Sequence, residues 1–480
     1  MSQIQESLLN NVNTYSSPSD LKITDVRFVD LLNAPMHCIL VKIYTNQGLV
    51  GIGEVRDNSS RTYAAMLKGR LLGENPCNVD KIFQRLKQFN GPGRQGGGVS
   101  GIEIALWDLA GKAYGVPIYA MLGGKFRENV RVYCDLGEFL PPSLQYKNEE
   151  RLKEFPKKTG HSMGTILKRH IDDFGFTMVK ASFTIPDFAS LYPNERVFSA
   201  PDGYVKELIK AHHDQHLYSS RMISGAPDAD FTWRNNVFHM ANTQSPYRMM
   251  RFTEHGLDRF EKEVADMCAA LDSEVPVAID VAGCINLEDA GRLMQRLEKY
   301  SLAWLEDILP CTFVEEYKRL SQMSCTPLAT GEDLSLVEGF EPLCRERAVA
   351  LIHPDLCSSG GILETKRIGE MAERYNVGMV MHMCETPVAA LATAHMGLAT
   401  KNFIAMEFNA PYDTLWESML VGYEGKIIRD GFIEAPLKPG LGFDDLNDEV
   451  LKEYLSPYSD GLWKSTEQWD AEYSNDRLWS

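Results

Sequence analysis

Six ionisable side chains recur through the second half of the chain, each just after a short apolar run. Several carboxylates within a few ångströms of one another would repel and raise their own pKa values unless a cation lay between them. A set rich in carboxylates, without clustered cysteine or histidine, is typical of a hard ion such as Mg²⁺ rather than of zinc. The six side chains are those of Asp280, Glu306, Glu332, Asp355, His382 and Glu407.

The apolar runs before these residues have the length of buried strands, and a helix-like segment follows each. Parallel strands with crossover helices form either a barrel or a doubly wound sheet. In a barrel the carboxyl ends of the strands meet at one face, so the six groups would converge there. One acidic residue at a strand end more often caps a helix or lies in solvent, but six in succession favour a shared site. The runs are 275–279, 302–305, 327–330, 348–352, 377–381 and 403–406.

The first part of the chain has a different pattern. Apolar and polar residues alternate in two runs, 23–32 and 38–44, which predicts strands. Helical spacing follows over 61–90, then a glycine-rich break at 91–98 and a helix-like segment at 100–114. Strands followed by helices indicate an α+β unit, preceded by a polar and flexible N-terminus over 1–20.

Composition excludes several classes of function. The chain of 480 residues has a formal net charge of −17, which argues against nucleic acid and anionic membranes as partners and favours a small-molecule substrate. Its ten cysteines form no CxxC pair, and the N-terminus lacks the order of a signal peptide. We therefore expect reduced thiols, no membrane insertion and a cytoplasmic location.

The order Lys180, Asp280, Glu306, Glu332, Asp355, His382, Glu407 resembles the active-site order of the mandelate racemase subgroup of the enolase superfamily. Two stretches support the resemblance: ALWDLAGKAYGVPIYAMLGG at 105–124 and DGFIEAPLKPGLG at 430–442. The resemblance implies an α/β fold, a modified TIM barrel of the form (β/α)₇β with an N-terminal α+β capping domain. The capping domain would span 21–134, with 412–480 returning to it, and the barrel 135–411, with an insertion at about 183–250.

The resemblance also implies roles for these residues. Asp280, Glu306 and Glu332 would ligate Mg²⁺, which chelates the carboxylate of the substrate. His382 would remove the proton next to that carboxylate, Asp355 would hold the histidine ring, and Glu407 would lie beside the substrate carboxylate. Members of the family usually assemble into dimers or octamers, so we expect a homo-oligomer.

The chain departs from the family pattern at the end of the second barrel strand. Racemases and lactonising enzymes of the subgroup carry Lys-x-Lys there, whereas residues 179–182 read VKAS, which leaves Lys180 and puts Ser182 in place of the second lysine. Ala282 likewise stands where relatives often have a histidine or asparagine. A single histidine can remove the α-proton and then protonate the β-hydroxyl, as in family members that resemble rhamnonate dehydratase.

These observations predict a hydro-lyase, a carbon–oxygen lyase that converts an aldonate or aldarate to its 2-keto-3-deoxy acid. An epimerase, racemase or cycloisomerase of acid sugars is the alternative if Lys180 or a residue of the insertion acts as a base on the opposite face. A ligand-binding protein without turnover is the alternative outside enzymes. We expect substrate contacts from Ser182, His37, Arg61 and Tyr63, in or near the loops 33–37 and 56–63. The insertion at 183–250 would form a lid or a subunit contact.

Overall fold

The computed structural model describes three ranges of the chain: 17–136 except 33 and 35, 158–209, and 250–471 except 273, 284, 413–415 and 457–458. Nearly all of the predicted flexible N-terminus lies outside the described residues. So do residues 210–249, which hold most of the predicted insertion. Among the described residues, no helix is both long and apolar enough to cross a bilayer.

Eight parallel strands form a closed barrel. Each strand pairs with the next along the chain, and the last strand, β13, also pairs with the first, β4, which closes the ring. The closure decides between the two architectures that the sequence left open, because a doubly wound sheet has two free edges. The strands are β4 (Asn129–Cys134), β5 (Val179–Ser182), β8 (Val277–Asp280), β9 (Leu305–Glu306), β10 (Leu328–Thr330), β11 (Leu351–Ile352), β12 (Gly378–Met381) and β13 (Phe403–Phe408).

In the described residues a main helix follows each of the first seven strands, as the form (β/α)₇β requires. Short helices α9 (Ile185–Leu191) and α18 (Leu356–Ser359) precede two of them. All six apolar runs predicted as strands are strands, with ends shifted by a few residues. The main helices are α8 (Gly160–Phe174), α14 (Glu254–Ala270), α15 (Leu287–Leu297), α16 (Val314–Leu320), α17 (Leu336–Arg345), α19 (Ile362–Arg374) and α20 (Pro387–Leu398).

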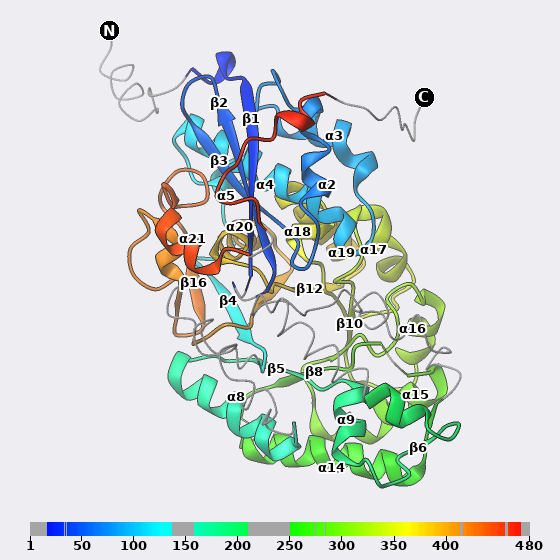
Figure 1. Cartoon of the computed structure of the whole chain (residues 1–480). Helices are drawn as coiled ribbons and strands as arrows, with labels where there is room; N and C mark the ends of the chain where they lie inside the picture. The colour runs from blue at the N-terminus through cyan, green and yellow to red at the C-terminus, as the bar shows by residue number, and fades with distance from the viewer. Residues whose placement is uncertain are drawn as a thin grey trace.

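The capping domain is an antiparallel sheet of three strands covered by helices, and it lies at one end of the barrel (Figure 1). Two strands, β1 (Ile23–Leu31) and β2 (Cys38–Thr45), were predicted, but β3 (Val50–Val55) was not. Gly51 and Gly53 interrupt the apolar pattern of β3, because helix α4 (Gly97–Tyr114) packs directly on them. A Cβ on Gly53 would lie 2.1 Å from the carbonyl oxygen of Gly101. The other helices of this domain are α2 (Thr62–Ala65), α3 (Val79–Leu86) and α5 (Ile118–Met121).

Two buried carboxylates of the capping domain hold it on the barrel. Glu54 of β3 accepts hydrogen bonds from the backbone N–H groups of Thr386 and Ala389, at the start of α20. Glu103 of α4 accepts from the N–H groups of Ile362 and Leu363, at the start of α19. The first N–H groups of a helix have no partner within the helix and carry partial positive charge. These contacts therefore give the N–H groups an acceptor and the buried carboxyl oxygens a donor.

The C-terminal segment contacts both the barrel and the capping domain. Strand β16 (Phe432–Glu434) pairs with β4 and with β15 (Ile428–Arg429), while β14 (Leu420–Val421) pairs with β17 (Asp445–Leu446). Beyond α21 (Asp448–Tyr454), Asp470 forms an ion pair with Lys68 of the capping domain. Strand β4 pairs with β5 and β13, so it is the first strand of the barrel. The predicted division of the chain into domains stays a prediction.

Candidate active site

The carboxylates predicted as metal ligands lie together at the carboxyl ends of their strands. Asp280 and Glu306 are direct neighbours in the register of β8 and β9. Glu332 follows β10, and its carboxylate, that of Glu306 and the imidazole of His353 each offer a ligand atom within 4.8 Å of the others. The barrel thus brings to one face residues that are far apart in the sequence.

The electrostatics of this group fit a cation. Burial, together with the neighbouring carboxylates, raises the pKa of Asp280 to about 7, and burial is also the main reason that the pKa of Glu306 rises to about 7. Burial acts in the same direction on Glu332, but His382, Arg56 and nearby cations lower the pKa of its carboxyl to about 2. A divalent ion would favour ionisation of the buried acids Asp280 and Glu306, and oxygen ligands suit Mg²⁺.

Lys180 lies between two of these acids. Its Nζ is 2.7 Å from Oε1 of Glu306 and 2.9 Å from Oε1 of Glu407, and its side chain is buried. Burial would lower the pKa of this amine, but the two carboxylates raise it well above its ordinary value. The two ion pairs therefore favour the charged form of Lys180. Burial lowers the pKa of His382, but Cys384, Glu332 and Asp355 raise it well above its ordinary value, so the contacts of the two side chains, and not their pKa directions, distinguish them as bases.

His382 and Asp355 form the predicted pair. Nδ1 of His382 is 2.7 Å from Oδ2 of Asp355, and its Nε2 is 3.2 Å from Oε2 of Glu332. Asp355 caps the start of α18 through a hydrogen bond that its Oδ1 accepts from the N–H of Cys357, at 2.7 Å. The pair therefore leaves Nε2 as the ring nitrogen that faces the group of predicted metal ligands.

Glu407 is part of a network of buried polar side chains that the sequence did not predict. The hydroxyl of Tyr133 is 3.3 Å from Oε2 of Glu407 and 2.9 Å from Nε2 of His353. Nδ1 of His353 in turn lies 3.5 Å from Oε1 of Glu306. Burial raises the pKa of Glu407, although Lys180 opposes the shift, and burial lowers the pKa of His353 well below its ordinary value.

The expected substrate contacts have other partners in this structure. Ser182 donates a hydrogen bond to Oδ2 of Asp135, at 2.6 Å. His37 and Arg61 both contact Asp30 within the capping domain. Arg61 also pairs with Asp460 of the C-terminal segment. Tyr63 is half-buried near the start of α2. Their roles in substrate binding stay predictions.

Arg56 is the main residue that sequence reasoning missed, since it was included only as the start of the loop 56–63, in or near which substrate contacts were expected. It follows β3 of the capping domain, is fully buried, and contacts Asp355 through Nη1. The same nitrogen lies 2.9 Å from Nδ1 of His382. No signal in the barrel pattern could have found it, because it comes from the other domain.

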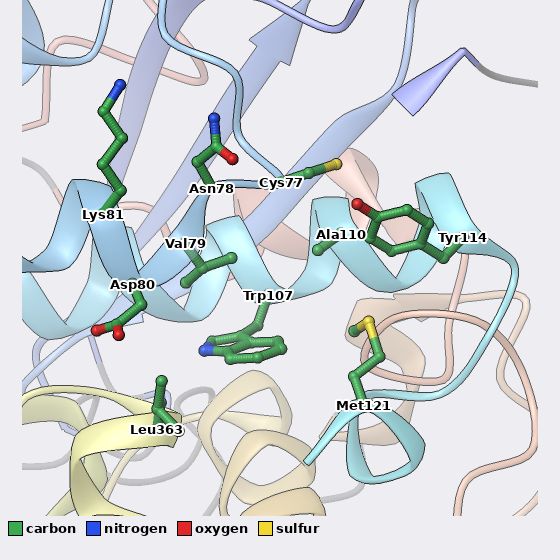
Figure 2. Close-up of a pocket in the computed structure, with 10 residues that line it drawn as sticks. All are labelled: Cys77, Asn78, Val79, Asp80, Lys81, Trp107, Ala110, Tyr114, Met121 and Leu363. Atoms are coloured by element: carbon green, nitrogen blue, oxygen red, sulfur yellow. The ribbon is translucent and has the colours of Figure 1, made fainter. Parts of the chain in front are cut away.

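A cavity of about 530 Å³ lies away from this site (Figure 2). Its walls come from the start of α3, from α4 and α5, and from Leu363 of α19, with the rings of Trp107 and Tyr114 on one side. None of the strand-end residues described above lines it.

Comparison with known proteins assigns the family. Residues 32–123 match the N-terminal domain of mandelate racemase and muconate lactonizing enzymes, and residues 239–449 match the enolase C-terminal domain-like family. Together these matches span more than half of the chain. The protein belongs to the mandelate racemase and muconate lactonizing enzyme group of the enolase superfamily.

Curated relatives and a solved structure agree with this family. The chain is 29% identical to D-xylonate dehydratase of Haloferax volcanii, over 92% of this chain and 91% of the relative. It is 24% identical to D-galactonate dehydratase of Variovorax paradoxus, over 91% of this chain and 96% of the relative. A mandelate racemase/muconate lactonizing enzyme-like protein from Rubrobacter xylanophilus superposes with a TM-score of 0.69 at 25% identity, covering 92% of this chain and 99% of that one.

Proposed function

We propose that the protein is a Mg²⁺-dependent dehydratase that converts an acid sugar to its 2-keto-3-deoxy acid. The observation that carries the proposal is the orientation of His382. Its Nδ1 is held by Asp355, and its Nε2 faces Glu332 in the group of predicted metal ligands. A base in this position can reach the carbon next to a carboxylate bound at that group.

Each residue of the site has its own role in the proposed reaction. Mg²⁺ bound by Asp280, Glu306 and Glu332 would offset the negative charge that develops on the substrate carboxylate. Nε2 of His382 takes the α-proton, and Asp355 stabilises the imidazolium that results. The imidazolium then gives its proton to the β-hydroxyl, so the C–O bond breaks and water leaves. The enol that remains becomes the 2-keto-3-deoxy acid.

Lys180 and Glu407 act on the substrate carboxylate in this proposal. The lysine is a buried cation, so it offsets negative charge without accepting a proton. The raised pKa of Glu407 favours its protonated form, which can donate a hydrogen bond to an anionic oxygen.

The contacts of Lys180 and Ser182 favour dehydration over epimerisation. An epimerase needs acid and base groups on both faces of the α-carbon, and the opposite face would have to use Lys180 or a residue of the insertion. That amine is ion-paired to two carboxylates, and Ser182 is hydrogen-bonded to Asp135. The relatives named D-xylonate and D-galactonate dehydratase act on aldonates by their names, which supports the same substrate class here.

The test is a screen of aldonates and aldarates with Mg²⁺ present, read out as formation of 2-keto-3-deoxy acids. We expect turnover of at least one aldonate. Epimerised sugar acids without keto products would favour the alternative enzyme. Tight binding of an acid sugar without chemical change would favour a ligand-binding protein.

A further inference from the structure

The end of strand β3 of the capping domain contacts, at two points, the barrel loop that carries His382. Glu54 and Arg56 are two residues apart at the end of this strand, a spacing that puts both side chains on the same side of an extended chain. Glu54 binds Thr386 and Ala389, just beyond His382, and also accepts a hydrogen bond from the hydroxyl of Thr386. Arg56 reaches His382 itself.

The guanidinium of Arg56 is enclosed by acids. Nη1 contacts Oδ2 of Asp355, Nε lies 2.8 Å from Oδ1 of Asp57, and Nη2 lies 3.8 Å from Oε1 of Glu332. Glu385 is at the limit of an ion pair, 4.0 Å away. A fully buried cation surrounded in this way has little freedom to move, because leaving the acids would expose uncompensated charge.

Oδ2 of Asp355 therefore has two partners, Nη1 of Arg56 and Nδ1 of His382, while Oδ1 accepts from the N–H of Cys357. Nδ1 of His382 lies near both Asp355 and Arg56, but arginine only donates hydrogen bonds. With Arg56 bound to Oδ2, the carboxylate of Asp355 holds the ring so that Nδ1 faces this oxygen and Nε2 faces Oε2 of Glu332, 3.2 Å away.

We propose that Arg56 is a positioning residue for the His382 and Asp355 pair. The same packing of the capping domain on the barrel that buries Arg56 then also holds His382 in its orientation. The inference rests on the proposed function for its kinetic consequences, but not for its structural ones. Arg56 fixes the carboxylate of Asp355, the carboxylate fixes the ring of His382, and Glu54 fixes the loop that carries the ring.

The test uses the full chain with ¹⁵N-labelled histidine, in the wild type and in Arg56→Gln and Arg56→Lys. His382 is identified among the 11 histidines by the signals that disappear in His382→Asn. Lys68→Gln is the matched control, since Lys68 is also a buried cation of the capping domain, ion-paired to Asp25 and Asp470 away from the pair.

In the wild type we expect a single set of ring signals, as from a ring held in one orientation. In Arg56→Gln these signals should shift or broaden as the ring samples other orientations, and Arg56→Lys should restore them in part. Lys68→Gln should leave them unchanged. Unchanged ring signals in Arg56→Gln would overturn the inference whether or not any acid sugar is turned over.

The kinetic arm separates positioning from a general loss of stability. For the best substrate, Arg56→Gln should lower kcat by about 10- to 100-fold, the typical effect of a misplaced reacting group, with a smaller change in KM. The Kd for Mg²⁺, measured by calorimetry, should stay within a few-fold of the wild type. An Arg56→Gln protein that loses thermal stability as Lys68→Gln does, but keeps its kcat, would assign Arg56 a structural role only. A wild type that dehydrates no acid sugar would refute the proposed function and leave the ring-nitrogen result to decide this inference.

Discussion

Nζ of Lys180 lies 2.7 Å from Oε1 of Glu306, so the lysine of the second barrel strand is ion-paired to a residue predicted to bind the metal. The second oxygen of Glu306 accepts a hydrogen bond from the indole N–H of Trp304, at 2.8 Å. Both oxygens are therefore oriented by neighbours. Partners of this kind keep a ligand in place and tune its basicity.

The first prediction concerns Glu306 as a metal ligand. Glu306→Gln should weaken Mg²⁺ binding because a neutral amide replaces an anionic oxygen, and the loss should exceed the roughly 10- to 100-fold typical of changes in outer partners. Calorimetric titration with Mg²⁺ gives the Kd of each variant. Glu315→Gln, an exposed carboxyl on α16, serves as the control. Equal affinity in the wild type and Glu306→Gln, or full activity in excess chelator, would refute the metal site.

The second prediction concerns the close packing of β3 on α4. Gly53→Ala puts a methyl group 2.1 Å from the carbonyl oxygen of Gly101, so either the strand or the helix must move. Overpacking of this kind costs about 1–3 kcal/mol in the free energy of unfolding, which denaturant titration measures. Gly339→Ala is the control, because the nearest atom to its added Cβ is a side-chain carbon 3.7 Å away. A Gly53→Ala protein as stable as the wild type would show that the packing of β3 on α4 accommodates a methyl group without loss of stability.

Much of the fold follows from the sequence. Six of the eight barrel strands lie in short, mainly apolar runs followed by helical segments, so all six predicted runs were found. Strand β3 escaped prediction because its glycines serve a contact with α4 that only the folded chain shows. Arg56 escaped for a related reason, since the pattern along one domain does not reveal a side chain that enters the site from another.

Within the site, too, the position of a residue along the chain could be predicted, but the direction of its side chain could not. The order of Asp280, Glu306 and Glu332 could be read from the chain because each ends a strand of a regular repeat. His353 also follows a strand, yet nothing in the sequence says that its ring points inward to Tyr133 and Glu306. The direction of a side chain depends on packing between strands that are distant in sequence.

The third prediction concerns pH and Glu103, which joins α4 to the start of α19. Burial raises the pKa of this carboxyl from its ordinary 4.5 to about 8. The folded chain thus holds the proton more tightly than the unfolded chain does. This contribution to stability is complete below pH 4.5 and is lost as the pH rises to about 8, at no more than about 1.4 kcal/mol per pH unit.

Glu103→Gln cannot ionise, so its free energy of unfolding relative to the wild type should rise with pH across this window. Denaturant titrations at several values between pH 5 and 9 measure the difference, and changes from other groups cancel in it. The exposed Glu315→Gln variant should give a difference that does not vary with pH. A flat difference for Glu103→Gln would mean that Glu103 ionises in the folded chain as easily as in the unfolded chain.

The fourth prediction separates His382 from Lys180 as the base. His382 has Nε2 directed toward Glu332, whereas Nζ of Lys180 is ion-paired to both Glu306 and Glu407. His382→Asn should therefore abolish dehydration and lower exchange of the substrate α-proton by about 10²- to 10⁴-fold, the usual contribution of a general base. Lys180→Met should lower kcat but retain measurable exchange, because the lysine only offsets charge on the carboxylate.

The two variants are compared by incubation with substrate in D₂O, with the α-position followed by proton NMR. Ser182→Ala is a useful third variant, because it removes the hydroxyl that stands where relatives have a second lysine without touching His382. It should exchange the α-proton as the wild type does if the opposite face of the substrate carries no base. Washout that persists in His382→Asn and disappears in Lys180→Met would make lysine the base. The proposal of a dehydratase with His382 as its single base would then be wrong. The epimerase alternative would be favoured, although the ion pairs of Lys180 now argue against it.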